Sequence, residues 1–302
     1  MQTDRRRYRL AAFTKNKTNP AYTGARLGAD RMAARHGCTL THHVPDKPDD
    51  VDEQRALIEA VLAERPDAIL IAPAHATALN DTLRRVLAAG IPLLCFVSRP
   101  DDIACTAYVG SDDRALARGI AGHLFASLPK GGDVAVLEGH PNAITTAPRT
   151  AGFRDAAEAR PGIHIKHTRI GYFQRAEGRT AMAELLATDP RIDGVLAAND
   201  AMALGALDAM RESGRKIPLV GVNATPEGVQ AIKAGDMLGT AAFDAMKMTC
   251  LSVEAAVRVL SGQRVPGEIM LPVEIVDRRN CAAWDRPYSD RPLPEWGAYV
   301  TG

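Results

Sequence analysis

Pro66-Asp67-Ala68-Ile69-Leu70 and Gly90-Ile91-Pro92-Leu93-Leu94 frame a helical pattern at residues 79–88 and decide the fold. Ile192-Asp193-Gly194-Val195-Leu196 and Ile217-Pro218-Leu219-Val220 frame a second helical pattern in the same way, at residues 201–211. Short apolar runs that alternate with helices are typical of parallel strands covered by helices on both faces. The internal resemblance therefore predicts two similar α/β lobes.

The same alternation of strands and helices continues on both sides of these two stretches. Strands are predicted at residues 8–13, 38–44, 68–72, 92–97 and 107–109, and then at 134–137, 164–170, 195–197 and 219–222. One helix is predicted to begin at Pro20, and the others span residues 51–64, 79–88, 149–159, 176–186, 201–211 and 227–233.

Three more elements follow the second set: a strand at 239–243, a helix at 246–260 and an apolar strand at 268–276. They have no lobe of their own, so we expect the chain to recross between the lobes and complete both. This predicts residues 1–110 and 244–272 as an N-terminal lobe, and residues 111–243 and 273–302 as a C-terminal lobe. The connecting strands would then lie side by side as a hinge.

The composition favours a small neutral ligand. The chain has 302 residues, 46% of them apolar, and a formal net charge of +1, so it supplies no basic face for nucleic acid or an anionic membrane. The five cysteines lack CxxC or Cys/His spacing, so we expect neither a metal site nor a disulfide framework, and no cofactor. The first seven residues are not followed by a signal-like apolar stretch, which leaves a cytosolic protein or a trimmed signal peptide as alternatives.

Polar side chains follow the predicted strands, at the edge of a parallel sheet where ligands bind. Amides offer donors and acceptors, guanidinium offers a fixed fork of donors, and aromatic faces cover C–H surfaces, so this set suits a polyhydroxylated molecule. The residues in these loops are Lys15, Asn16, Asn19, Ser98, Arg99, Arg149, Phe173, Asn199, Asp200 and Asn223.

Several of these residues also have a purely structural interpretation. Asn199 with Asp200 makes a good helix N-cap without any ligand. Arg99 could be a solvated loop residue, and Arg149 could pair with an acid. Phe173 and Tyr22 could belong to the core. The sequence leaves these alternatives open.

Four motifs together resemble the periplasmic ribose-binding protein family, and the match runs in order from about Arg9 to Val276. The motifs are Thr18-Asn19-Pro20-Ala21-Tyr22, Arg149-Thr150-Ala151-Gly152-Phe153, Asn199-Asp200-Ala201-Met202-Ala203-Leu204-Gly205-Ala206 and Val220-Gly221-Val222-Asn223-Ala224-Thr225-Pro226-Glu227-Gly228. The resemblance implies a type I periplasmic binding protein, with two Rossmann-like lobes joined by three crossing strands. It also implies a monomer in the periplasm that closes on a sugar or polyol and docks on an ABC transporter permease, without chemistry and without binding nucleic acid.

The resemblance assigns ligand contacts to Asn19, Tyr22, Arg99, Arg149, Phe173 and Asn199. With Asn16, Ser98, Asn223 and Phe243 these form the predicted ligand-binding set. The sequence departs from the family where Ser98 and Asn223 stand in place of aspartates, and where Phe243 replaces a glutamine. Losing two carboxylates weakens charge-assisted bonds to ring hydroxyls, so another pentose, a hexose or an alditol is as good a candidate as ribose.

The predicted function is therefore the solute-binding component of an ABC-type sugar importer. One alternative is the effector-sensing domain of a lactose-repressor-like regulator. Such a regulator carries a helix-turn-helix before the first strand, and only seven residues precede Tyr8, so this alternative requires that the DNA-binding segment is absent from the sequence. A nicotinamide-dependent enzyme is the other class, but no Gly-x-Gly-x-x-Gly follows a strand. We expect no enzymatic activity. The tail from Trp284 to Gly302 lies beyond the matched region and receives no role.

Overall fold

The computed structural model describes residues 7–189 and 191–300, which divide into two compact units. Unit 1 contains the chain up to Gly110, Ala245–Leu271 and the chain from Pro292 onward, and unit 2 contains Ser111–Asp244 and Pro272–Arg291. The chain thus changes unit after Gly110, Asp244, Leu271 and Arg291. The last change differs from the expectation that residues 273–302 stay in the second lobe.

The reason for this difference lies in contacts of the tail with unit 1. Glu295 lies 3.3 Å from the guanidinium of Arg35, and the Trp296 ring centroid lies 4.6 Å from the guanidinium carbon of Arg258. Local sequence patterns carry no sign of such pairings, because the partners are more than 35 residues apart in the chain.

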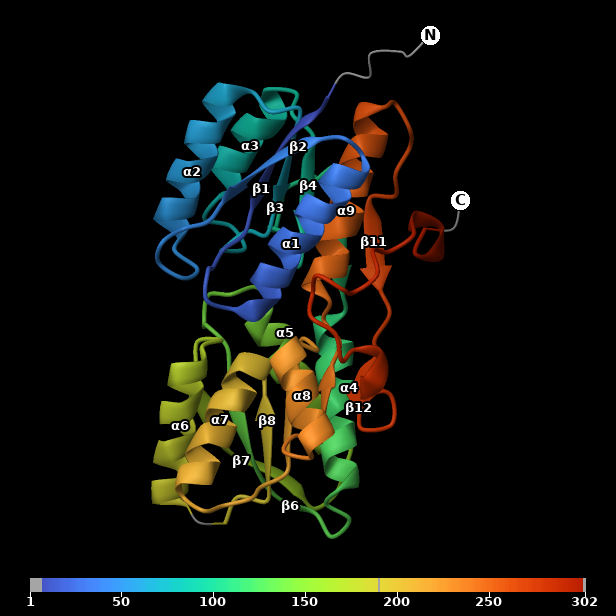
Figure 1. The fold of residues 1–302 in the computed structure, drawn as a ribbon. Helices are drawn as coiled ribbons and strands as arrows, with labels where there is room; N and C mark the ends of the chain where they lie inside the picture. Colours follow the sequence, from blue (N-terminus) through green and yellow to red (C-terminus); the bar gives the residue numbers. More distant parts are fainter. Residues whose placement is uncertain (1–6, 190, 301–302) are drawn as a thin grey trace. The chain divides into compact units, whose positions relative to one another are not determined.

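Unit 1 is a six-stranded sheet in the order β11-β5-β4-β3-β1-β2, with helices on both faces (Figure 1). The pairs β1–β2, β1–β3, β3–β4 and β4–β5 are parallel. Its strands are β1 (Arg9–Phe13), β2 (Thr39–His43), β3 (Ala68–Ile71), β4 (Leu93–Phe96), β5 (Ala107–Ser111) and β11 (Glu268–Leu271), and its helices are α1 (Pro20–Arg35), α2 (Val51–Glu64), α3 (Asn80–Ala88) and α9 (Ala245–Leu260).

The core of unit 1 follows from its apolar central strands. Every residue of β3 and β4 is buried, because α1 and α9 pack together on one face of the sheet and α2 and α3 on the other (Figure 1). Gly28 in α1 permits the close approach of α9, since a Cβ atom at this position would lie 2.8 Å from the Met246 carbonyl oxygen.

Unit 2 repeats the arrangement, with strand order β12-β10-β9-β8-β6-β7. Its edge strand β12 pairs antiparallel with β10, whereas the other pairs are parallel. The strands are β6 (Gly132–Glu138), β7 (Ile163–Ile170), β8 (Gly194–Ala197), β9 (Leu219–Val222), β10 (Gly239–Ala241) and β12 (Ile275–Asp277). The helices are α4 (Asp113–Ala126), α5 (Thr146–Glu158), α6 (Arg175–Thr188), α7 (Asp200–Glu212) and α8 (Pro226–Ala234), with a single 3-10 turn, η1 (Cys281–Ala283). A second 3-10 turn, η2 (Trp296–Ala298), lies in the part of the tail that belongs to unit 1.

The predicted two-unit α/β architecture is confirmed, but two elements differ from the prediction. Helix α4 was not predicted, although Asp112 caps it and its buried residues recur at helical spacing. The single strand predicted at 268–276 is two strands, β11 and β12, which belong to different units. A continuous apolar run does not reveal where the chain changes sheets.

Asp200 connects three elements of unit 2 through its buried carboxylate. Its Oδ2 accepts hydrogen bonds from the Thr225 backbone N–H at 2.8 Å and from the Thr225 hydroxyl at 3.1 Å, and its Oδ1 accepts one from the Thr240 hydroxyl at 2.6 Å. These bonds join the start of α7 to the start of α8 and to β10. Burial raises the pKa of Asp200 from 3.8 to about 6, against the lowering effect of the hydrogen bonds from Thr240 and Thr225.

We expect Gly205→Ala to destabilise unit 2, because a Cβ atom on α7 at this position would lie 2.0 Å from the Arg175 carbonyl oxygen of α6. The expected loss is about 1–3 kcal/mol, as for other overpacked sites. Gly122→Ala in α4 is the matched control, since its Cβ would meet no atom within 4 Å. It should stabilise the helix by about 0.5–1 kcal/mol. Denaturant unfolding of both variants measures the difference, and equal effects would contradict the packing argument.

Asp200 should make stability depend on pH in a defined direction. Because its folded pKa of about 6 exceeds the ordinary 3.8, its contribution is fully present below that lower value and is lost as the pH rises through 6. The unfolding free energy of the wild type minus that of Asp200→Asn should therefore fall by about 3 kcal/mol between about pH 3 and 8. A difference that rises with pH would refute the assignment.

Candidate functional site

Arg149 lies in the first turn of α5, which begins three residues earlier than the helix predicted at 149–159, and it is 3% exposed. Its Nε donates to Asp113 Oδ1 at 2.7 Å, and its Nη1 donates to the Ala198 carbonyl oxygen at 2.7 Å. Asp113 begins α4, and Ala198 directly follows β8. The interpretation that Arg149 pairs with an acid is therefore confirmed, and the pair fixes α5 to α4 and to the end of a central strand.

Two predicted aromatic residues surround the Arg149 guanidinium. Its central carbon lies 4.6 Å from the Phe243 ring centroid and 5.8 Å from that of Phe173. Phe173 has φ of 60°, and Gly139 makes room for its ring, because a Cβ there would lie 2.0 Å from the ring. The arrangement brings three of the predicted residues, Arg149, Phe173 and Phe243, together in unit 2.

Asn199 holds the backbone of Phe173 and also caps a helix. Its Oδ1 accepts a hydrogen bond from the Met202 N–H at 2.9 Å, and its Nδ2 donates to the Phe173 carbonyl oxygen at 3.0 Å. The N-cap interpretation is thus confirmed. The bond to Phe173 uses one of the two N–H donors of the amide, so the cap does not exhaust its hydrogen-bonding capacity.

Asn223 lies in a turn with an unusual backbone. Its φ is 127° and that of Ala224 is 52°, both in the region that favours glycine. Such conformations cost about 1–3 kcal/mol per residue and persist where the surroundings enforce them, often at binding sites. The Asn223 N–H donates to the Ala241 carbonyl oxygen at 2.9 Å, which holds the turn against the end of β10.

In unit 1, Asn16 and Asn19 organise the loop that follows β1. Asn16 Oδ1 accepts from the N–H groups of Thr18 at 3.0 Å and Asn19 at 2.7 Å, while its Nδ2 donates to Asp49 at 3.2 Å. Asn19 Oδ1 caps α1 by accepting from the Ala21 N–H at 3.0 Å. These local bonds explain why asparagine occurs at both positions, and a ligand contact by either residue remains a prediction.

The other predicted residues of unit 1 differ in exposure. Arg99 is exposed, forms an ion pair with Glu268 at 3.2 Å, and lies 5.2 Å from the Tyr108 ring centroid. Ser98 is buried, with its hydroxyl 3.5 Å from the Pro73 carbonyl oxygen. Tyr22 is buried on α1. Arg99 is thus neither a free cation nor a buried anchor in this structure.

Arg149 in unit 2 and Arg99 in unit 1 are each paired with a carboxylate that the sequence pattern did not identify. Asp113 neutralises Arg149, and Glu268 neutralises Arg99. The helical spacing of apolar residues after Asp112 could have predicted α4, and with it an acid at the carboxyl edge of the sheet. Glu268 follows a segment without regular secondary structure, so no periodic pattern in the sequence predicted its position.

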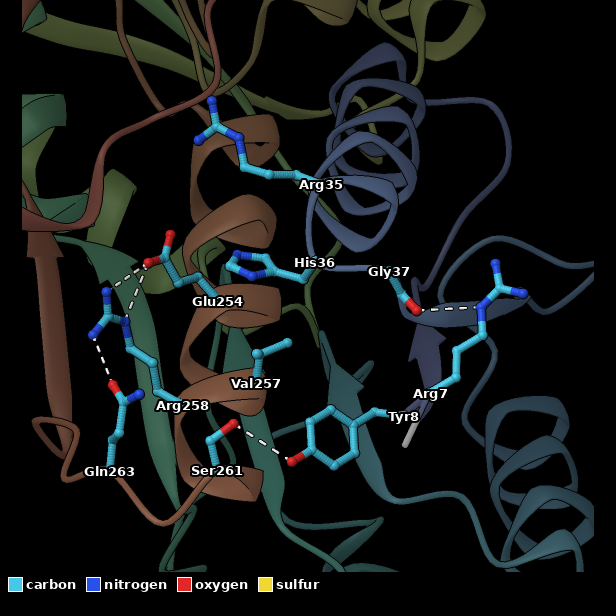
Figure 2. Close-up of a pocket in the computed structure, with 10 residues that line it drawn as sticks. All are labelled: Arg7, Tyr8, Arg35, His36, Gly37, Glu254, Val257, Arg258, Ser261 and Gln263. Carbon is cyan, nitrogen blue, oxygen red and sulfur yellow. Dashed lines mark hydrogen bonds and ion pairs between the residues drawn. The ribbon is translucent and has the colours of Figure 1, made fainter. Parts of the chain in front are cut away.

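A polar pocket of 750 Å³ lies elsewhere in unit 1, beside the start of β1 and the last turns of α1 and α9 (Figure 2). Figure 2 shows Arg258 between Glu254 and Gln263, to which it donates at 2.8 Å and 3.0 Å, and Tyr8 beside Ser261. The side chains of these residues thus form hydrogen bonds with one another. The pocket is at the opposite end of β1 from the loop where parallel sheets bind ligands, so we do not assign it to the predicted site.

The described part of the chain offers neither a cluster of metal ligands nor a membrane-spanning helix. Residues 7–189 and 191–300 contain no group of three or more His, Cys, Asp or Glu side chains that could hold a metal ion. Among the helices of those same ranges, none has the length and apolarity needed to cross a bilayer.

Comparison with known proteins gives consistent matches over most of the chain. The family described as periplasmic binding protein domain matches residues 10–264. The ribose import binding protein of Bacillus subtilis is 28% identical over 272 residues, which cover 90% of this chain and 88% of that protein.

Two solved structures extend the comparison to the fold. A solute-binding protein of an ABC transporter from Actinobacillus succinogenes, with bound D-allose, gives a TM-score of 0.88 at 25% identity, covering 91% of this chain and 99% of that one. A second, from Bacillus halodurans with bound myo-inositol, gives 0.86 at 26% identity, covering 92% and 97%. The predicted fold and resemblance are confirmed, and the chain belongs to the periplasmic binding protein family, whose members bind solutes and are not enzymes.

Proposed function

We propose that this protein is the solute-binding component of an ABC-type importer and binds a neutral monosaccharide or sugar alcohol. The observation that carries the proposal is the buried Arg149, fixed by Asp113 and the Ala198 carbonyl oxygen beside two aromatic rings. A guanidinium held in this way offers donors to hydroxyl groups at low cost in entropy. Aromatic faces next to it suit the C–H surface of a sugar.

The charge balance of the candidate residues favours an uncharged ligand. Arg149 and Arg99 are each paired with a carboxylate, at 2.7 Å and 3.2 Å. A carboxylate or phosphate ligand would have to compete with Asp113 or Glu268 for these arginines. Hydroxyl groups can accept from a guanidinium that keeps its ion pair, because arginine has five N–H donors.

The physiological role follows from the family. We propose that the ligand-bound protein acts in the periplasm as a monomer and delivers its ligand to a membrane permease. The relative from Bacillus subtilis is an import protein, and the solved structures with D-allose and myo-inositol belong to ABC transporters. These relatives favour the importer over the effector domain of a repressor.

The first test is a binding screen with matched neutral and anionic sugars. D-ribose, D-allose, myo-inositol and xylitol should be compared by thermal shift and calorimetry with D-ribose 5-phosphate and D-glucuronate. A ligand at about 100 times its Kd should raise the unfolding free energy by about 2.7 kcal/mol. We expect at least one neutral compound and neither anion to do so. Preferential binding of an anion would overturn the charge argument, and a protein that binds nothing across wider sugar and polyol panels would overturn the function.

The second test is Arg149→Ala. Loss of buried donors should weaken binding of the preferred sugar by about 2–4 kcal/mol, roughly 30- to 1,000-fold. The variant should also melt at a lower temperature without ligand, because Asp113 and the Ala198 carbonyl oxygen lose their partner.

The double variant Arg149→Ala/Asp113→Asn separates these two effects. Removing the carboxylate charge that Arg149 balances should recover part of the melting temperature but not the affinity. Arg154→Ala, an exposed arginine on the same helix, is the control and should change neither quantity. Near-normal affinity in the folded double variant would exclude Arg149 from the binding site.

A further inference from the structure

The tail beyond β12 inserts an arginine into unit 2. Arg291 is 5% exposed, and its Nη2 donates to the Ala224 carbonyl oxygen at 2.8 Å and lies 3.3 Å from that of Trp284. Its guanidinium carbon lies 4.7 Å from the Tyr288 ring centroid and 5.2 Å from that of Trp284. Residues of the tail thus surround the Arg291 guanidinium, which also bonds to a turn 67 residues earlier in the chain.

The turn that Arg291 contacts is the strained one after β9. Three polar groups from other elements already hold it: the Ala241 carbonyl oxygen, the Thr240 hydroxyl and the Asp200 carboxylate. They bind the N–H groups of Asn223, Ala224 and Thr225, respectively. The bond from Arg291 differs, because it holds a carbonyl group of the turn and comes from the tail.

We propose that Arg291 is a positioning residue for ligand binding, which fixes the Ala224 carbonyl group and so holds the Asn223 side chain in its binding orientation. The proposal rests on the proposed function and on Asn223 as a ligand contact. Rotation about the N–Cα bond of Ala224 would relax its positive φ and swing its carbonyl group relative to the adjacent Asn223. A charged donor on this carbonyl group opposes that rotation more strongly than a neutral one.

A purely space-filling role does not account for an arginine here. Burying a guanidinium costs more than burying an apolar side chain of similar size unless its donors are used. The Arg291 Nε donates to the Arg286 carbonyl oxygen, and its Nη2 donates to those of Ala224 and Trp284. Two of these lie in the tail itself, so among the hydrogen bonds of Arg291 the one to Ala224 links the tail to the rest of unit 2.

A double-mutant cycle tests the proposal. Calorimetric titrations with D-ribose, D-allose and myo-inositol are made on the wild type, Arg291→Ala, Asn223→Ala and the double variant. Arg291→Ala should weaken binding about tenfold, as expected for the loss of one buried charge-assisted hydrogen bond. In the Asn223→Ala background the same change should alter affinity by less than about twofold, because the two residues act through one contact.

Two further variants separate positioning from folding. Arg291→Lys retains a charged donor and should recover part of the affinity, whereas Arg286→Ala removes an exposed tail arginine and should bind like the wild type. An equal tenfold loss from Arg291→Ala with and without Asn223 would overturn the proposal, as would wild-type affinity in a folded Arg291→Ala protein.

A measurement without ligand keeps this test independent of the proposed function. Hydrogen exchange of a peptide that covers residues 219–228 should accelerate about threefold or more in Arg291→Ala and remain unchanged in Arg286→Ala. Unchanged exchange in Arg291→Ala would show that the tail does not hold the turn. If none of the three sugars binds the wild type while exchange accelerates as expected, the ligand class proposed above is wrong and the anchoring of the turn stands.

Discussion

A buried guanidinium is the constraint around which the candidate site of unit 2 is organised. Taking such a group out of water costs several kcal/mol unless its charge is paired and its donors are used. Arg149 meets this condition with Asp113 from α4 and the carbonyl oxygen of Ala198 after β8, and its guanidinium lies near the rings of Phe173 and Phe243. Burying one side chain therefore fixes the positions of four segments at the carboxyl edge of the sheet.

Adjacent residues at the start of α7 extend this organisation in two directions. Asn199 binds the backbone of Phe173, and Asp200 binds Thr225 and Thr240. The first connects the helix to the loop after β7, and the second connects it to the turn after β9. Asn199 and Asp200, which begin one of the motifs of the family resemblance, thus connect two loops to α7. Asn199 also caps this helix.

The sequence predicted most of the strands and helices of both units because alternation and burial are local properties. It also predicted Arg149, Asn199 and Phe173 near one another, since the carboxyl ends of parallel strands meet at one edge. It did not predict Asp113, whose helix α4 was missed, or the division of residues 268–276 between two sheets. Nor did it predict the contact of Arg291 with Ala224. Pairings across 36 or 67 residues depend on the packed fold and leave no trace in a local pattern.

In the proposed site, Ser98 and Asn223 stand where the resemblance to ribose-binding proteins implies aspartates, and this replacement would change the physical basis of recognition. A carboxylate accepts strong hydrogen bonds from hydroxyl groups, but it must first be stripped of water and it cannot donate. Serine and asparagine bind water less strongly and can both donate and accept, so each bond is weaker while the cost of desolvation falls. Selectivity then depends more on the direction of each side chain than on its charge. Under this proposal, the bonds that hold the backbone around Asn223 would contribute to selectivity, because an amide that rotates freely would accept one hydroxyl configuration as readily as another.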